Sequence, residues 1–109
     1  RCIIPFSGWY EWQKQKDAKV PYYLYSNAKY FAGIFNDSGC CILTRESANT
    51  LSHIHPRQPV LLQENEIGEY FMGQNIYDSS ANHDVQFYEV SKQVNSPKNN
   101  FPSLTEEIC

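Results

Sequence analysis

The sequence predicts an α+β domain built mainly from antiparallel β-strands, with two helices. Short segments rich in aromatic and β-branched residues recur along the 109-residue chain, polar turn sequences separate them, and helical periodicity occurs in only two places. A chain of this length is typical of one domain. Its residues are 41% hydrophobic and 15% aromatic, which is enough apolar surface for one core. We therefore expect a single domain over residues 1–109.

The first half of the chain is expected to be all strand. The predicted strands cover residues 3–12, 20–25, 30–35 and 40–44. Pro5 and Gly8 interrupt the first of these, and a polar turn follows it. The second and third are separated by the short polar segment 26–29, so we expect them to form a β-hairpin. Asn36-Asp37-Ser38-Gly39 is typical of a tight turn before the fourth.

The second half contains both predicted helices. Thr44 can cap a helix over Arg45–Ile54, and Pro56 disfavours helical geometry beyond it. Apolar residues recur on one face of this helix at Ala48, Leu51 and Ile54. The second helix is expected over Glu64–Met72, with Gly73 just past its end. The remaining segments are predicted as strands at 59–62 and 85–90, and as loops at 74–84 and 94–102.

Charge argues against a generally basic nucleic-acid-binding protein. The formal net charge is -3, and the nine lysines and arginines are scattered along the sequence. A local basic groove remains compatible with this charge, because binding depends on where charges cluster rather than on their sum. No apolar stretch reaches the roughly 20 residues that a membrane helix needs, so we expect no membrane partner.

The cysteines indicate a reduced protein. They are Cys2, Cys40, Cys41 and Cys109. Adjacent Cys40 and Cys41 are poorly placed to bridge each other, and no CxxC motif is present. Both lie in a strand-like apolar run, so we expect buried, inert thiols rather than nucleophiles. Reduced thiols suggest an intracellular location, which would be the cytoplasm of a bacterium, near its nucleoid, or a nucleus.

Glu11 is the first candidate for catalysis. It lies in Gly8-Trp9-Tyr10-Glu11-Trp12, where one carboxylate is surrounded by three aromatic rings. In an extended segment, Glu11 shares a face with Trp9, while Tyr10 and Trp12 point the other way. Apolar surroundings raise the pKa of a carboxyl group, which suits proton transfer near neutral pH. The alternative is a glutamate at a strand end that reaches solvent.

His55 is the second candidate. It comes just before Pro56, which stiffens the chain and could fix the direction of the ring. An imidazole beside a carboxylate would form an acid–base pair. Arg57 follows two residues later and could grip a phosphate. The alternative is a helix-capping histidine and a solvated arginine.

A metal site is disfavoured by the spacing of the possible ligands. His53 and His55 form an HxH pair, and His83 and the two adjacent cysteines are the other possible ligands. This spacing fits no standard zinc site. We expect no metal and no cofactor.

Three segments, in order, resemble the SOS-response-associated peptidase (SRAP) family. RCIIPFSGWYEW at residues 1–12 is similar to the family's first signature, which ends in an aromatic pair followed by Glu-Trp. ILTRESANTLSHIHPRQPVLL at residues 42–62 resembles its second motif, which contains Ala-Asn and Ile-His-x-Arg. VNSPKNNFP at residues 94–102 resembles its closing loop. The resemblance covers nearly all of the chain.

The resemblance implies a fold and an activity. The fold would be an open, mainly antiparallel barrel, and the activity would be the capture of abasic sites in single-stranded DNA. In this family an amino-terminal Cys, exposed by removal of the residues before it, forms a thiazolidine with the abasic sugar. Carried over to this sequence, the proton-transfer residues are Glu11 and His55. Arg57 and Trp12 would contact DNA, and Asn95 would brace the adjacent loop.

Two departures from the family pattern matter. Gln58 stands where the family usually has Met, next to the predicted catalytic histidine. The family's amino-terminal portion, with its nucleophilic Cys and an Asn-Ala-Arg segment, has no counterpart in residues 1–109, because Cys2 matches the Cys of the first signature. We therefore expect a partial domain that does not crosslink DNA alone and is less stable than its length suggests. A non-covalent single-stranded DNA-binding module and an inactive truncated remnant are the alternatives.

Overall fold

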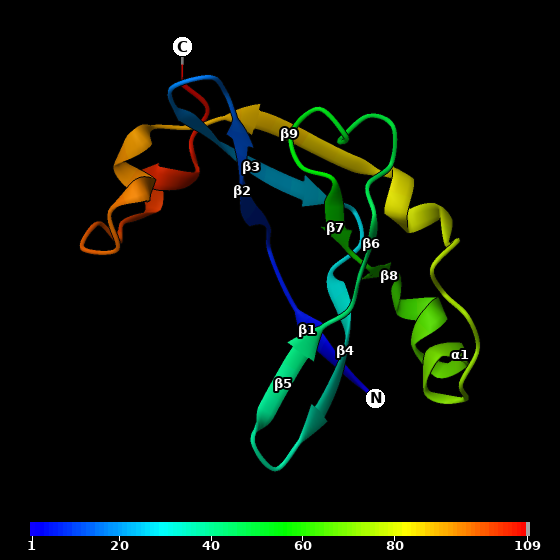
Figure 1. Ribbon diagram of the computed structural model, residues 1–109. Helices are drawn as coiled ribbons and strands as arrows, with labels where there is room; N and C mark the ends of the chain where they lie inside the picture. The colour runs from blue at the N-terminus through cyan, green and yellow to red at the C-terminus, as the bar shows by residue number, and fades with distance from the viewer. Residues whose placement is uncertain (109) are drawn as a thin grey trace.

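The computed structural model describes residues 1–108 and shows the predicted α+β architecture (Figure 1). All of its strand pairs are antiparallel. The strands in this described part are β1 (Cys2–Pro5), β2 (Trp9–Lys14), β3 (Lys19–Ser26), β4 (Tyr30–Asn36), β5 (Gly39–Ile42), β6 (Thr44–Glu46), β7 (Arg57–Pro59), β8 (Leu61–Leu62) and β9 (Val85–Glu89). They form three sheets and no closed barrel within residues 1–108.

Helical structure is sparse. The α-helix α1 covers Ile67–Phe71, and the 3₁₀-helices are η1 (Glu64–Glu66), η2 (Ser80–His83), η3 (Lys92–Asn95) and η4 (Pro102–Thr105). The predicted helix over Glu64–Met72 therefore corresponds to η1 and α1 together. Gly73 ends it with a φ of 89°, a left-handed conformation that favours glycine. Among the described residues, no helix combines the length and apolar character needed to cross a bilayer.

The predicted hairpin between residues 20–25 and 30–35 is wrong. β3 is the central strand of one sheet, in the order β2-β3-β9, whereas β4 is the central strand of another and pairs with β1, β5 and β8. Each strand thus already has a neighbour on both sides. The link between them is a compact turn, in which Ala28 N–H donates to Ser26 Oγ at 3.0 Å. This turn carries the chain from one sheet to the next.

The predicted helix over Arg45–Ile54 is also wrong. Thr44–Glu46 pair with Arg57–Pro59 as β6 and β7, and Ser47 N–H donates to Pro56 O at 3.0 Å. These contacts close the segment into a loop of tight turns, so long-range pairing overrides its local helical preference. The apolar periodicity still predicts burial correctly, with exposed fractions of 4%, 2% and 4% for Ala48, Leu51 and Ile54.

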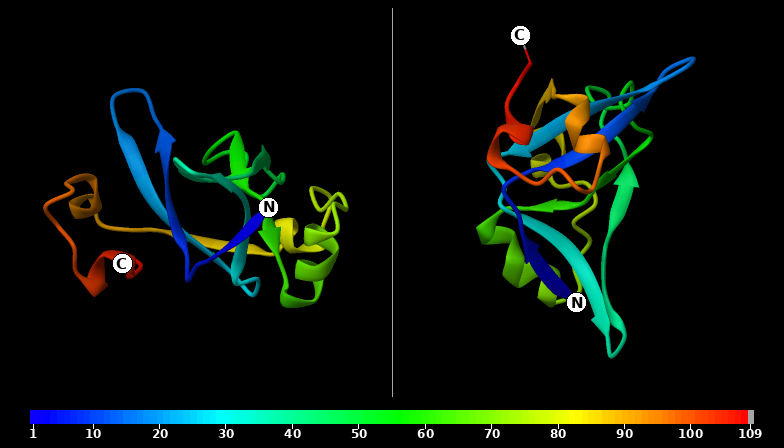
Figure 2. Two further views of the ribbon diagram at one scale, coloured as in Figure 1. Left: turned by 90° about the horizontal axis from the view of Figure 1, so that it is seen from below. Right: turned by 90° about the vertical axis from the view of Figure 1, so that its left-hand side faces the viewer.

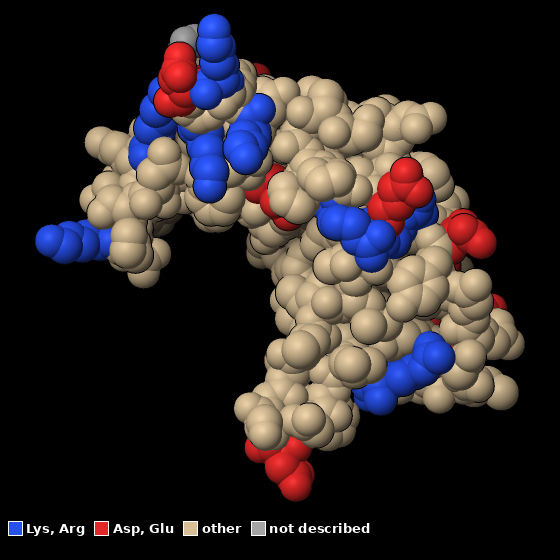
Figure 3. Space-filling view, viewed as in Figure 1, with Lys and Arg blue, Asp and Glu red and all other residues tan. Residues whose placement is uncertain are grey.

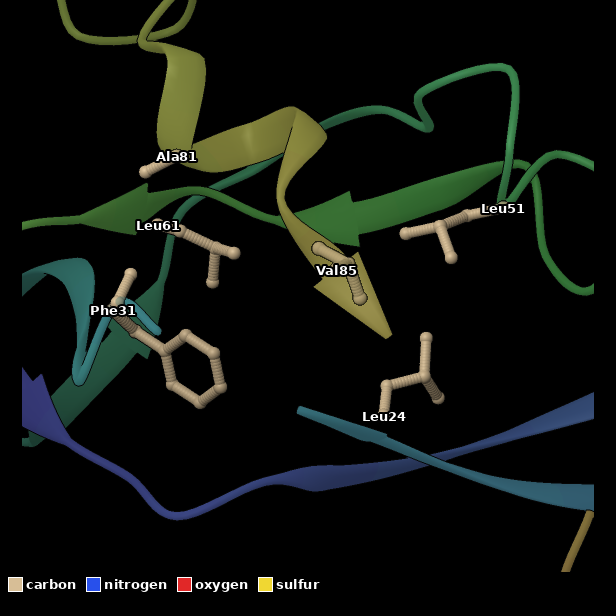
Figure 4. Packing of buried hydrophobic residues seen from close by; sticks show 7 residues of the cluster. Leu24, Phe31, Leu51, Leu61, Ala81 and Val85 are labelled. Atoms are coloured by element: carbon tan, nitrogen blue, oxygen red, sulfur yellow. The ribbon is translucent and has the colours of Figure 1, made fainter. Parts of the chain in front are cut away.

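The main core lies between the β2-β3-β9 sheet and the segments that cross it. Side chains from strands, turns and a 3₁₀-helix far apart in the sequence point into this core (Figure 4). Its buried members are Leu24, Ala28, Phe31, Leu51, Leu61, Ala81 and Val85. Trp9 packs against this core from β2, with its ring edge-on to Phe6 and Phe31 at 5.6 and 5.5 Å. The core therefore fixes the strand that carries Glu11.

A second buried cluster joins α1 to the β1-β4-β5 sheet. Tyr70 from α1 is fully buried in it, and its hydroxyl donates to Gly33 O. The other buried members are Ala32, Val60, Leu62 and Ile76. Arg1 lies over the Tyr70 ring at 4.6 Å and donates to Tyr70 O at 3.1 Å. The end of α1 is thus held to the first residue of the chain.

The β4–β5 hairpin extends away from both clusters (Figures 1 and 2). The predicted turn at its tip is confirmed: Ser38 N–H donates to Asn36 Oδ1 at 2.8 Å, and Gly39 has a φ of 144°. The expectation of buried thiols is wrong, because Cys40 and Cys41 are exposed on this hairpin and free. The outer part of the hairpin, residues 34–36 and 39–42, is exposed, whereas Phe31 and Ala32 at the start of β4 belong to the core clusters. Cys109 lies outside the described residues.

Candidate active site

β2 positions Glu11 at the edge of a sheet. Within the described part of the chain β2 pairs only with β3, so its other edge is open. Tyr10 contacts Trp12 and Tyr23 on one face, whereas Trp9 packs into the core on the opposite face. Glu11 lines the same small recess as Trp9 and Leu24. This confirms the predicted alternation, in which the carboxylate points toward the apolar side.

The surroundings of Glu11 favour its protonated form. Its side chain is only 23% exposed. Burial raises the pKa of the Glu11 carboxyl above its ordinary value of 4.5, and the nearby His55 opposes part of that shift. A carboxyl group with a raised pKa can hold a proton closer to neutral pH and release it to a substrate.

The structure brings Glu11 and His55 together. His55 Nε2 lies 3.8 Å from Glu11 Oε2, although the two residues are far apart in sequence. This distance allows an ionic interaction but is too long for a hydrogen bond. Acid–base contacts in unoccupied sites are often loose and tighten when substrate binds. The two side chains can therefore serve one reacting group.

The His55 loop is held on both sides. His55 N–H donates to Leu51 O at 3.2 Å, and the Gln13 side chain of β2 donates to His53 O at 2.9 Å. The Nδ1 atom of the His55 ring lies 3.2 Å from Arg57 N and 3.0 Å from Arg57 O. It can accept from the Arg57 N–H when Nδ1 carries no hydrogen and donate to the Arg57 carbonyl when it carries one. In both states Nε2 stays directed at Glu11.

Gln58 is a site residue that the sequence reasoning missed. It is 2% exposed, its Oε1 accepts from Ala48 N–H at 2.9 Å, and its Nε2 donates to Asn82 O at 3.0 Å. Asn82 is also fully buried and accepts from Leu61 N–H at 2.7 Å. These amides connect the two ends of the His55 loop to the core. The only signal in the sequence was the departure from the family's usual Met.

Arg57 lies beside the acid–base pair. It lines the same small, closed recess as Glu11 and His55. Its Nη2 donates to Thr44 O at 3.0 Å and to Thr44 Oγ1 at 3.1 Å, which anchors the guanidinium on β6. The remaining guanidinium nitrogens make no hydrogen bond within residues 1–108. They are therefore available to an anion.

Trp12 and Asn95 meet on the opposite face of β2. The indole Nε1–H of Trp12 donates to Asn95 Oδ1, and Asn95 ends η3. This contact ties β2 to the segment after β9. The structure thus places Trp12 and Asn95 together. Trp12 also lines a cavity that includes Glu11 and His55, whereas Asn95 does not.

Two buried polar atoms line the recess without partners. Trp9 Nε1 and Ser47 Oγ make no hydrogen bond in the described part of the chain. Both residues line the recess that contains Glu11 and His55. Buried hydrogen-bonding groups normally have partners, so these are two unsatisfied polar atoms in a largely apolar recess.

The histidines do not converge on a metal. The His53 ring packs edge-on against Phe87 at 5.3 Å, whereas His55 faces Glu11. Residues 1–108 contain no group of three or more His, Cys, Asp or Glu side chains arranged to hold a metal ion.

Comparison with known proteins identifies the family of this site. The profile described as SOS response associated peptidase (SRAP) matches residues 1–97. The chain belongs to the SRAP family. The match includes the first two motifs and the start of the third, so Glu11, His55 and Arg57 all lie within SRAP family sequence.

Several named relatives are similar to this SRAP chain. The abasic site processing proteins YoqW and YoaM of Bacillus subtilis are each 32% identical to it, over 97% of the chain. The match spans 57% and 56% of their lengths, so the chain covers little more than half of each. The abasic site processing protein HMCES of Xenopus tropicalis is 27% identical, and the match covers 99% of this chain and 43% of that protein.

A solved structure shares the fold of this SRAP chain. A protein from Bacteroides thetaiotaomicron superimposes with a TM-score of 0.74 and 22% sequence identity. The superposition covers 99% of this chain and 56% of that one. The arrangement of the three sheets is therefore shared with a solved structure.

The raised pKa of Glu11 gives a testable pH dependence. A carboxyl whose pKa is higher in the folded than in the unfolded chain contributes stability below its ordinary value of 4.5 and loses it as the pH rises through the raised pKa. Gln cannot ionise, so Glu11→Gln is expected to have a higher free energy of unfolding than the wild type at neutral pH. The difference should shrink toward pH 4.5. Urea unfolding across this range measures it, and a difference independent of pH would contradict the assignment.

Proposed function

We propose that this chain supplies the proton-transfer residues of a site that processes abasic sites in single-stranded DNA. The observation that carries the proposal is the approach of His55 Nε2 to Glu11 Oε2 at 3.8 Å beside Arg57. Membership of the SRAP family supports it, as do the names of the relatives, which are abasic site processing proteins.

The chemistry is an addition to the aldehyde of the ring-opened abasic sugar. The amine of an amino-terminal Cys attacks the aldehyde carbon to give a carbinolamine, which loses water to form an imine. The thiolate of the same Cys then adds to the carbon of the protonated imine, and the electron pair of the C=N bond moves to nitrogen to give a neutral thiazolidine. In the proposed site this Cys, freed by removal of the residues before it, comes from outside residues 1–109.

Glu11 and His55 divide the proton transfers. Protonated Glu11 donates to the departing hydroxyl group, which leaves as water, and the resulting carboxylate stabilises the cationic imine. His55 assists opening of the sugar ring by moving a proton between the ring oxygen and the anomeric hydroxyl. Arg57 holds a backbone phosphate, and Trp12, braced by Asn95, packs against the bound strand.

A hybrid protein tests the proposed function. The chain is joined behind the cysteine-led amino-terminal segment of an abasic site processing relative and incubated with a single-stranded oligonucleotide that carries one abasic site. We expect a covalent complex that survives a denaturing gel. It should be absent with an intact oligonucleotide and absent when the leading Cys is replaced by Ala. A hybrid that folds, as judged by circular dichroism, but forms no complex would refute the proposal.

A further inference from the structure

The β2–β3 hairpin holds two lysines directly opposite each other. Lys14 and Lys19 are partners in the strand register, and Lys16 lies in the turn between them. Like charges in opposed positions destabilise a strand pair. Neither lysine has a carboxylate within ion-pair distance in the described part of the chain. Only Asp17 provides a negative charge in this turn, so the protein leaves the repulsion largely uncompensated.

Two adjoining cavities connect these lysines to the acid–base pair. The first has a volume of about 350 Å³, and its lining includes Glu11, His55, Lys14 and Lys19. The second has a volume of about 360 Å³ and is lined by Trp12, Lys19 and Asn95. Because Trp12 and Lys19 line both, a continuous surface runs from the Glu11–His55 pair past the lysines to Asn95.

Positive charge is present on this surface at the β2–β3 hairpin, which carries Lys14, Lys16 and Lys19. Figure 3 shows several Lys or Arg side chains close together at the upper left, with acidic side chains beside them, and other Lys or Arg side chains elsewhere on this face. Three acidic residues lie instead on η1 and α1, at the opposite side of the molecule in Figure 1. The net charge of -3 therefore conceals a local positive field at this hairpin.

We propose that Lys14 and Lys19 bind backbone phosphates of single-stranded DNA next to the abasic nucleotide, and that the strand runs from the Glu11–His55 pair past Trp12 toward Asn95. The place of the abasic nucleotide rests on the proposed function, whereas the phosphate contacts do not. Phosphates neutralise the opposed lysines, and the Trp12 indole offers a face on which an unpaired base can stack. The surface thus combines the cationic and aromatic groups typical of single-strand binding.

Fluorescence anisotropy with a labelled oligothymidylate that lacks abasic sites tests the contacts. The 109-residue chain is titrated at salt concentrations from about 50 to 200 mM. Each lost phosphate contact lowers the slope of log K against log salt by about 0.7 for a single strand. We therefore expect a decrease of about 0.7 for Lys19→Gln and about 1.4 for Lys14→Gln/Lys19→Gln. The double variant should bind on the order of tenfold more weakly at low salt.

Lys29→Gln is the matched control. Lys29 follows β3 at its other end and donates to Ser26 O, away from both cavities, so its replacement should leave the slope unchanged. Three outcomes would overturn the inference. The double variant could show the same salt slope as the wild type, the wild type could fail to bind the oligothymidylate, or the wild type could bind a duplex equally tightly.

The two proposals fail in different ways. Loss of oligothymidylate binding in the lysine variants, without any covalent complex from the hybrid protein, would support the phosphate contacts and reject the abasic chemistry. A covalent complex that forms normally in the double variant, with an unchanged salt slope, would reject the phosphate contacts alone.

Discussion

Glu11→Gln is expected to slow covalent complex formation by the hybrid protein about 100-fold, the lower end of what general acid–base catalysis contributes. Gln keeps the size of the side chain but cannot donate a carboxyl proton to the departing hydroxyl group. The hydrogen-bonded frame around it, including the Gln13 contact with the His55 loop, does not involve the Glu11 side chain. The site should therefore stay assembled while the reaction slows. Single-turnover gel assays measure the rate constant.

β9 provides a matched control for this variant. Tyr22 of β3 is paired with Glu11 on one side and with Glu89 on the other, so the two glutamates occupy one row of the sheet. Glu89 is exposed, and β3 separates it from Glu11. Glu89→Gln should leave the rate unchanged. Equal slowing in both variants would show that a general change of charge, rather than proton transfer by Glu11, causes the effect.

Gln58→Met is expected to lower the free energy of unfolding by about 2–4 kcal/mol, because it leaves two buried backbone groups without partners. Ala48 N–H loses its acceptor and Asn82 O loses its donor. Met conserves the volume of the side chain, so the loss reports hydrogen bonds rather than a cavity. Thermal and urea unfolding measure it, and the melting temperature should fall by roughly 10 °C or more.

Gln86→Met is the control for this second variant. Gln86 is an exposed residue of β9, and its side chain makes no hydrogen bond within residues 1–108. Its replacement should change stability by less than about 0.5 kcal/mol. Similar stability of Gln58→Met and the wild type would show that the His55 loop does not depend on these amides.

Local pattern was enough to predict most strands and the side of β2 on which Glu11 lies, whereas the proton-transfer roles of Glu11 and His55 came from the resemblance to the SRAP family and stay a prediction. The alternation in Trp9–Trp12 placed Glu11 on the apolar face, and the structure has it there. Pro56 and the apolar spacing before it predicted a fixed direction for His55. Glu11 and His55 stand out by their side-chain chemistry and by their immediate neighbours, and both of these can be read directly from a sequence.

Long-range pairing decided the features that local pattern could not predict. Thr44–Glu46 would start a helix by propensity, but pairing with Arg57–Pro59 makes the segment a strand. Residues 20–25 and 30–35 look like a hairpin until each strand is seen to have other partners. Cys41 looks buried by composition, yet the hairpin that carries it extends from the body of the protein.

The burial of the Gln58 and Asn82 side-chain amides could not be predicted from the sequence for a different reason. Nothing local distinguishes Gln58 from an exposed glutamine, because its partners, Ala48 and Asn82, are ten and 24 residues away. Polar core residues are defined by the groups they satisfy, and those groups come together only in the folded chain.

The open edge of β2 has a consequence for how the site responds to heat. Within residues 1–108, β2 pairs with one neighbouring strand, β3. Its release therefore breaks the hydrogen bonds of only that strand pair. Local opening of such a segment costs less free energy than global unfolding. Glu11 would then swing away from the imidazole while the inner strands stay intact. Loss of the Glu11–His55 approach can thus precede melting, and any molecule that pairs with this edge would preserve that approach.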